Sequence, residues 1–294
     1  MKNIKLPSWL KWTIKLGITG LAIFIVYRNI DIVKISDLFA QSNAYLLALG
    51  LLVFALTKGV ESLRLNVFFR AKGIQLSENT NFKLYLLGLY YNIFLPGGIG
   101  GDGYKVYWIN KRINIPIKDI IWASIHNRIS GLGAMFSLAL LTLSFISFSV
   151  SLQHYIWLLI PVFYLAYFIG LRLFFKAFTA SFIQGVLYSI AVQGMQLICA
   201  HLILLALGVE TNFYDYWFLF LLSNIAFVIP VTVGGVGSRE LVFALGAQYL
   251  AIDLNAVLAL SLCFYVLRLT VSFVGIYYFL NPDGILLKDT KTSC

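Results

Sequence analysis

The sequence predicts an all-α protein that crosses a membrane several times as a helical bundle. Three observations lead to this fold class. Of the 294 residues, 60% are hydrophobic and only 12% are charged, whereas a soluble domain carries about 25% charged residues. Apolar stretches long enough to cross a hydrocarbon core of about 30 Å recur along the whole chain. Two shorter apolar stretches each run into a cluster of proline and glycine, as expected for helices that break within a membrane.

Six stretches are predicted to be full spans, and each must be helical because lipid offers its backbone groups no other partner. They cover residues 9–27, 44–64, 118–148, 154–175, 182–207 and 256–280. The first follows a run of lysines, as the core of a signal peptide does, but no small-residue cleavage site comes after it. We therefore expect it to remain in the protein as a span.

The shorter apolar stretches, 82–95 and 213–229, are predicted to be re-entrant helical hairpins. Short cytoplasmic loops collect Lys and Arg, and the basic groups at 64–83 and 105–118 fall on one side only if 82–95 enters the membrane and returns. The same rule places the N- and C-termini in the cytoplasm. The alternative treats both stretches as ordinary spans, which gives eight crossings and places 105–118 outside.

The chain is predicted to be one membrane domain made of two repeats, 1–150 and 151–294. Each repeat has two spans, a re-entrant hairpin and a further span, so the odd number of crossings inverts the second repeat relative to the first. Corresponding landmarks are Asn92, Pro96 and Arg128 in the first repeat and Asn224, Pro230 and Arg268 in the second. Inverted repeats with broken helices are typical of secondary transporters, and the pattern therefore indicates transport.

Candidate binding residues lie at the two glycine clusters and on the spans. Closely spaced glycines expose backbone N–H groups, and a phosphate could be held there at a helix start. A central arginine costs at least ~2.5 kcal/mol in a membrane helix, so Arg268 should face a cavity or an acidic partner. The predicted binding residues are Arg64, Asn92, Gly100, Gly101, Asp102, Lys105, Arg128, Asn224, Gly234, Gly235, Arg239, Glu240 and Arg268. The predicted structural residues of the hairpins are Pro96, Gly97, Gly98, Pro230 and Gly237.

Several of these residues also have a purely structural interpretation. Asp102 is a plausible helix N-cap, and the glycines could serve only a tight turn. Glu240 could form a local ion pair with Arg239, and Arg128 could lie at the membrane interface. Each alternative predicts a residue that shapes the fold without touching a ligand.

A charged stripe on span 44–64 is a further candidate. Lys58, Glu61 and Arg64 stand three residues apart and share one face of a helix. The stripe either snorkels to the cytoplasmic end or contributes to a polar path, to which Gln193 and Gln196 of span 182–207 would add.

The sequence gives little support for a dinucleotide-binding, metal, catalytic or nucleic-acid-binding site. Gly98, Gly100 and Gly103 match the dinucleotide fingerprint, but the strand that must precede it is missing. The three histidines have no acidic or cysteine neighbours at metal-ligand spacing, and no Ser-His-Asp arrangement or nucleophile elbow occurs. The net charge is +10, but the lysines and arginines that produce it flank apolar segments and form no basic stripe of the kind that binds nucleic acid. We expect no catalytic residue, no metal, no cofactor and no nucleic-acid partner.

The two proline–glycine motifs resemble those of the lysylphosphatidylglycerol synthase transmembrane-region family, also called flippase-like or UPF0104 proteins. The first motif runs from Asn92 through Pro96 and Gly97 to Asp102, followed by Arg128 with Gly131, and the second runs from Ile229 to Glu240. The resemblance covers nearly the whole chain. Gly103 departs from the family, which usually has an aliphatic residue there, and this weakens the helix start.

The resemblance implies a protein of the prokaryotic inner membrane. It also implies that this protein is related to the part of the multiple-peptide-resistance factor that flips aminoacylated phosphatidylglycerol between leaflets. The soluble synthase domain of that larger protein has no counterpart before Cys294, so we expect no lysyl-lipid synthesis and no enzyme activity. Other relatives accompany hopanoid, polyprenyl-sugar or envelope polysaccharide pathways, which leaves the substrate open.

The leading hypothesis is a flippase-like transporter that translocates a phospholipid or a lipid-linked sugar between leaflets. Arg64, Arg128, Arg239 and Arg268 would then hold an anionic headgroup. One alternative is a non-catalytic accessory subunit of a glycosyltransferase or lipid-modification pathway, and another is a membrane-embedded transferase that uses a polyprenyl-phosphate donor. Expected partners are membrane lipids with an anionic or polyprenyl-phosphate-sugar headgroup, with a second copy of the chain or an envelope-biosynthesis enzyme as further possibilities.

Overall fold

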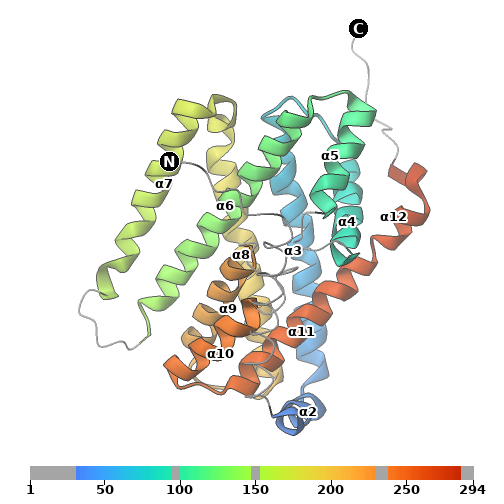
Figure 1. Ribbon diagram of the computed structural model, residues 1–294. Coiled ribbons are helices and arrows are strands. Elements are labelled where there is room, and N and C mark those ends of the chain that lie inside the picture. Colours follow the sequence, from blue (N-terminus) through green and yellow to red (C-terminus); the bar gives the residue numbers. More distant parts are fainter. Residues whose placement is uncertain (1–30, 95–99, 147–152, 229–237, 286–294) are drawn as a thin grey trace, which may run out of the picture.

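A computed structural model describes residues 31–94, 100–146, 153–228 and 238–285 (Figure 1). Within these ranges all regular secondary structure is helical, which confirms the predicted all-α class. The predicted first span, 9–27, lies outside the described residues.

The helices follow one another with short connections. The first part of the chain forms α2 (Ile32–Ala40), α3 (Ala44–Arg70), α4 (Glu78–Phe94), α5 (Gly100–Ile113) and α6 (Ile117–Leu143). The second part forms η2 (Gln153–Leu158), α7 (Leu159–Phe174), η3 (Lys176–Ser181), α8 (Phe182–Ala206), α9 (Phe213–Val228), α10 (Ser238–Leu250), α11 (Leu254–Phe273), α12 (Ile276–Leu280) and η5 (Pro282–Ile285).

Side-chain caps fix where several of these helices begin. The Asn43 carboxamide oxygen accepts hydrogen bonds from the first backbone N–H groups of α3, at 3.0 and 3.3 Å. Asp253 accepts from the N–H of Asn255 at the start of α11, at 2.9 Å. Asp31 caps the unpredicted helix α2 through the N–H of Lys34, at 3.1 Å. These oxygens satisfy backbone donors that have no partner within the helix.

Among the described residues, four long helices are apolar enough to cross a membrane, and they agree with four predicted spans. They are Ala44–Arg70, Tyr155–Phe174, Lys176–Ala206 and Leu254–Leu280. Helix α6 corresponds to the predicted span 118–148 and has 27 residues. Its first half carries Lys118, Asp119 and Arg128, so its apolar part is shorter than those of the other four.

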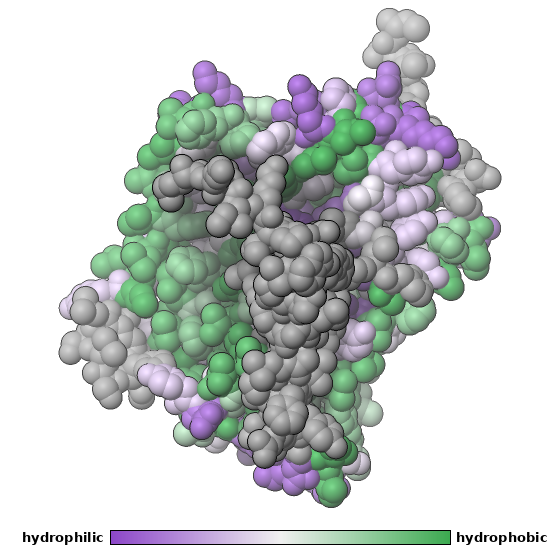
Figure 2. Space-filling view, viewed as in Figure 1, coloured by the Kyte–Doolittle hydropathy of each residue, from purple (hydrophilic) through white to green (hydrophobic). Residues whose placement is uncertain are grey.

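The surface is that of a membrane protein. Figure 2 shows hydrophobic residues over the sides of the molecule and hydrophilic residues gathered towards its two ends. Helix α7 exposes large apolar side chains: Val162, Leu165 and Leu173 are 61%, 61% and 66% exposed. Such a surface is stable in lipid and not in water. The chain is therefore a multi-pass membrane protein.

Two pairs of short helices lie at opposite ends of the bundle. Helices α4 and α5 pack against each other near the upper end in Figure 1, and α9 and α10 do so near the lower end. In the first pair, the backbones of Gly88 and Gly101 approach so closely that a Cβ on Gly101 would overlap the Gly88 backbone. Small residues permit this kind of contact between membrane helices.

Within the part of the chain that the structure describes, none of these four helices reaches the roughly 20 residues that a full crossing needs. They have 17, 14, 16 and 13 residues in chain order. Their pairing is compatible with the predicted hairpins. Re-entry into the bilayer and the inverted relation of the two halves stay predictions.

Two apolar cores fill the ends of the bundle, and α3 runs through both. The lower core includes Phe54 of α3 with Phe220 and Phe264, whose rings meet edge to face at 4.8 Å. The upper core includes Leu65 and Phe68 of α3. Cys199 and Cys263 are buried in the lower core, as small apolar residues would be. The stretch of α3 between the two cores carries the charged stripe.

Candidate functional site

Charged, amide and hydroxyl side chains from five helices meet between the two apolar cores. We call this set the polar cluster. It consists of Lys58, Glu61 and Arg64 of α3, Tyr85 of α4, Asp102 and Lys105 of α5, Asn127 and Arg128 of α6, and Ser189 and Gln196 of α8.

Glu61 is the centre of the polar cluster. Its carboxylate accepts hydrogen bonds from the Lys58 ammonium at 3.0 and 3.1 Å and from the Gln196 amide at 3.0 Å. The Tyr85 hydroxyl also donates to it. Lys58 and Glu61 are only 7% and 8% exposed, so the snorkelling interpretation of this stripe is wrong. A buried carboxylate in a membrane interior is tolerated because its lone pairs are satisfied in this way.

Arg64 extends the polar cluster towards α6 and α8. Its Nε donates to the Asn127 side-chain oxygen at 2.9 Å, and its Nη1 donates to the Ser189 hydroxyl at 3.1 Å. A Cβ on Gly131 would lie 3.0 Å from Nη1, so the guanidinium occupies the space that this glycine leaves. Arg64 is 8% exposed, and its hydrogen bonds among the described residues go to neutral groups.

Asp102 links the hairpin of α4 and α5 to α6. Its carboxylate accepts from the Lys105 ammonium at 3.1 Å and from two nitrogens of Arg128 at 2.9 and 2.6 Å. Lys105 also lies over the Tyr85 ring, 4.7 Å from its centre. Lys105 therefore connects Asp102 to Tyr85, and Tyr85 in turn donates to Glu61.

The N-cap interpretation of Asp102 is wrong. Helix α5 already includes Gly100 and Gly101, which places Asp102 inside its first turn. The Asn92 side chain instead accepts a hydrogen bond from the Gly101 N–H at 2.7 Å. Asn92 thus ties the end of α4 to the start of α5, and a role in substrate binding stays a prediction for it.

Arg239 and Arg268 form a second group, which we call the arginine pair. Arg239 of α10 is 6% exposed, and its Cζ lies 5.8 Å from the ring centres of both Phe243 and Phe264. Its Nε and Nη2 have no hydrogen-bond partner among the described residues. Arg268 of α11 lies over Phe227 at 4.9 Å. No ion pair between described residues includes either arginine.

The arginine pair and the polar cluster lie within electrostatic reach of each other. Arg268 repels both Arg239 and Lys58, and it is attracted by Glu61. Glu240 attracts its neighbour Arg239. The two groups together hold six cationic side chains against the carboxylates of Glu61, Asp102 and Glu240. This excess of positive charge is suited to an anion.

The remaining predicted residues divide into two sets. Asn224 of α9 is buried, and its Nδ2 has no hydrogen-bond partner among the described residues. The predicted binding and hairpin residues that lie outside the described ranges are Pro96, Gly97, Gly98, Pro230, Gly234, Gly235 and Gly237.

The polar cluster contains residues that the predicted site omits. Glu61 could have been selected from the sequence, because an acidic residue inside an apolar span is a functional candidate by default. Gln196 confirms the predicted polar contribution of α8. Tyr85, Asn127 and Ser189 carry no comparable signal, since tyrosine, asparagine and serine are common in membrane helices at many depths.

We expect Asp102→Asn to lower the free energy of unfolding by about 1.5–3 kcal/mol, the value of hydrogen bonds to a charged group. The substitution leaves Lys105 and Arg128 without their shared carboxylate. The measurement is denaturant unfolding in detergent of Asp102→Asn, Arg128→Gln and the double variant. Lys34→Gln is the control, because its pair with Asp253 spans 3.9 Å with side chains 60% and 43% exposed and should contribute little. Additive losses from the two single variants would contradict the prediction.

An apolar helical bundle with buried charges between its cores defines a polytopic membrane protein with a polar interior. The chain belongs to the family described as lysylphosphatidylglycerol synthase TM region, whose model matches residues 12–180 and 169–275. This match confirms the resemblance drawn from the two motifs. A comparison with curated proteins found no similar sequence.

Proposed function

We propose that the protein is a flippase-like transporter, which moves an anionic phospholipid or lipid-linked sugar between the leaflets of a prokaryotic inner membrane. The observation that carries this proposal is the arginine pair. Two arginines repel each other inside the bundle, and Arg239 leaves two nitrogens without a hydrogen-bond partner among the described residues. A buried guanidinium such as that of Arg239 needs an anion.

The sequence supports the view that the anion comes from outside the protein. Of the segments that border the described ranges, 1–30, 95–99, 147–152 and 229–237 contain no Asp or Glu, and 286–294 contains only Asp289. Glu61 and Asp102 are already held by Lys58 and Arg128. A lipid phosphate would supply the missing charge, since guanidinium forks match phosphate oxygens. The acyl chains would remain in the surrounding lipid.

The same contacts argue against a transferase. A polyprenyl-phosphate-dependent transferase needs a carboxylate that can act as a base. Glu61 receives three donors, from Lys58, Tyr85 and Gln196, and Asp102 receives two cations. We therefore propose that the protein is not itself an enzyme. An accessory subunit of a lipid-modifying enzyme is the alternative function.

We expect purified protein in proteoliposomes to exchange fluorescent anionic or aminoacylated lipids between leaflets. Arg268→Gln and Arg239→Gln should each slow this exchange about tenfold or more, which corresponds to about 1.4 kcal/mol. The measurement is the fraction of labelled lipid that becomes accessible to a membrane-impermeant quencher with time. Arg172→Gln is the matched control, because Arg172 is exposed on α7 and should leave exchange unchanged.

Two outcomes would oppose the proposal. If folded protein exchanges none of a broad lipid panel, the accessory-subunit alternative takes precedence, and partner capture becomes the next experiment. If both arginine variants exchange lipid at the wild-type rate, the lipid path does not include the arginine pair.

A further inference from the structure

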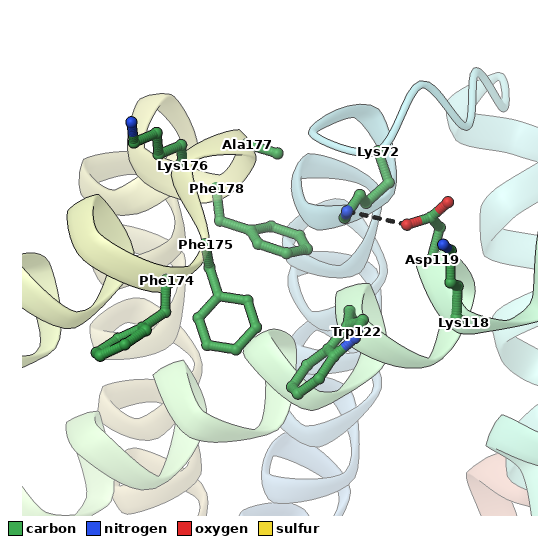
Figure 3. Close-up of a pocket in the computed structure, with 9 residues that line it drawn as sticks. All are labelled: Lys72, Lys118, Asp119, Trp122, Phe174, Phe175, Lys176, Ala177 and Phe178. Atoms are coloured by element: carbon green, nitrogen blue, oxygen red, sulfur yellow. Dashed lines mark ion pairs between the residues drawn. The ribbon is translucent and has the colours of Figure 1, made fainter.

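A cationic pocket lies at the end of the bundle where α3 ends and α6 begins, apart from the polar cluster. It has a volume of about 290 Å³. Figure 3 shows three elements around it: the chain just after α3, the first turns of α6, and the junction of α7 with η3. The lining residues are Lys72, Lys118, Asp119, Trp122, Phe174, Phe175, Lys176, Ala177 and Phe178. We call it the interfacial pocket.

The interfacial pocket carries more positive than negative charge. Lys72 forms an ion pair with Asp119 at 2.9 Å, and its ammonium lies 5.5 Å from the centre of the Phe178 ring. Lys118 and Lys176 form no ion pair with a carboxylate in the part of the chain that the structure describes. Two lysines are therefore available to an anion.

The other side of the interfacial pocket is apolar and faces lipid. Phe174 is 77% exposed and its neighbour Leu173 is 66% exposed, and both belong to the outward surface of α7. Trp122 is 38% exposed. In Figure 3 the rings of Trp122 and Phe175 lie between the Lys72–Asp119 pair and Phe174. Tryptophan and lysine together are typical of the depth at which lipid headgroups lie.

An aromatic floor separates the interfacial pocket from the interior of the bundle. The buried His126 ring lies 4.2 Å from that of Phe178 and 4.8 Å from that of Phe175. A ligand in this pocket would thus be bounded below by packed rings and would remain at the surface. The pocket can be occupied whether or not the polar cluster transports a lipid.

We infer that the interfacial pocket binds the phosphate-containing headgroup of an anionic phospholipid. Lys118 and Lys176, which lie at opposite ends of the pocket in Figure 3, attract the phosphate from either side, and an acyl chain lies along Phe174 and Leu173 on α7. A lipid fits better than a free phosphate ion, because four of the nine lining residues are aromatic and their exposed part continues into the lipid-facing surface. Two exposed lysines attract an anion only weakly in water, whereas an acyl chain adds apolar attachment.

The test uses the fluorescence of Trp122 in lipid nanodiscs. The probe is phosphatidylglycerol brominated on its acyl chains, present as a minor component among phosphatidylcholine, and brominated phosphatidylcholine is the reference. The Trp122 signal is the difference between the wild type and Trp122→Phe, since the chain has 6 tryptophans. We expect brominated phosphatidylglycerol to quench this signal more strongly than the reference. Each of Lys118→Gln and Lys176→Gln should weaken the preference about fivefold, the attraction of one basic residue to an anionic surface.

The matched control is the double variant Lys83→Gln/Lys111→Gln. It removes two lysines from the first turns of α4 and the last turn of α5, outside the pocket lining. It should keep the wild-type preference, and unchanged gel-filtration profiles would show that all variants are folded. Equal quenching by the two lipids would overturn the inference, as would an equal loss in the control variant. Complete displacement by excess inorganic phosphate would also overturn it, because the site would then bind the ion alone.

Discussion

Glu61→Leu should destabilise the protein by about 3–5 kcal/mol, the usual cost of removing one partner from a buried ion pair. The substitution leaves the ammonium of Lys58 without its carboxylate at a position that is 7% exposed. It also removes the acceptor for Tyr85 and Gln196. The measurement is the free energy of unfolding in mixed micelles with increasing denaturant.

The double variant Lys58→Met/Glu61→Leu tests the physical reason for this loss. It replaces both charges with apolar side chains of similar size, and such replacements of buried ion pairs are often close to neutral. We expect it to regain most of the lost stability. A double variant no more stable than Glu61→Leu would show that the loss comes from the packing of α3 and not from the unpaired charge.

The second large effect is expected for Gly101→Ala. A Cβ at this position would overlap the backbone of Gly88 on α4, and backbone atoms cannot move aside as a flexible side chain can. Helices α4 and α5 would have to separate, which strains the contact between Asn92 and the Gly101 N–H. We expect a loss of at least ~2 kcal/mol, within the upper range for overpacked sites, measured as a lower midpoint of thermal unfolding.

Gly103→Ala is the matched control for this effect. Gly103 lies two residues further along the same helix, and a Cβ on it would meet nothing within 4 Å. Alanine favours a helix over glycine by about 0.8–1.0 kcal/mol, so this variant should be as stable as the wild type or more stable. A similar loss in both variants would mean that α5 does not tolerate alanine generally, and would contradict the close approach of Gly88 and Gly101.

Some of the candidate site follows from residue type alone. Arg268 and Arg239 are notable in the sequence because an arginine within or beside an apolar segment is costly in lipid. The glycine cluster before Asp102 likewise predicts a close backbone approach. Its partner Gly88 could not be identified in advance, since a single glycine in an apolar helix fits many packings.

Which polar side chains meet depends on contacts between residues that are distant in sequence. Glu61 accepts from Gln196, 135 residues away in sequence, and Arg128 donates to Asp102, 26 residues away. No local pattern contains such pairs. The sequence therefore suggested that Asp102 caps a helix, which is its usual role near a helix start, while the fold placed Arg128 of α6 beside it in addition to Lys105 of the same helix.

The sequence by itself determined that this protein is a bundle of membrane helices, and where four of its spans lie. It could do so because crossing lipid requires a contiguous apolar segment whose backbone groups are satisfied internally, and each segment meets this condition independently. Only the tertiary structure decided that Lys58, Glu61 and Arg64 are buried and not at the surface, that Arg64 donates to Asn127 and Ser189, and that Arg128 meets Asp102. Those outcomes depend on side chains that other helices bring to the same place, because a charge in an apolar interior is stable only beside its partner.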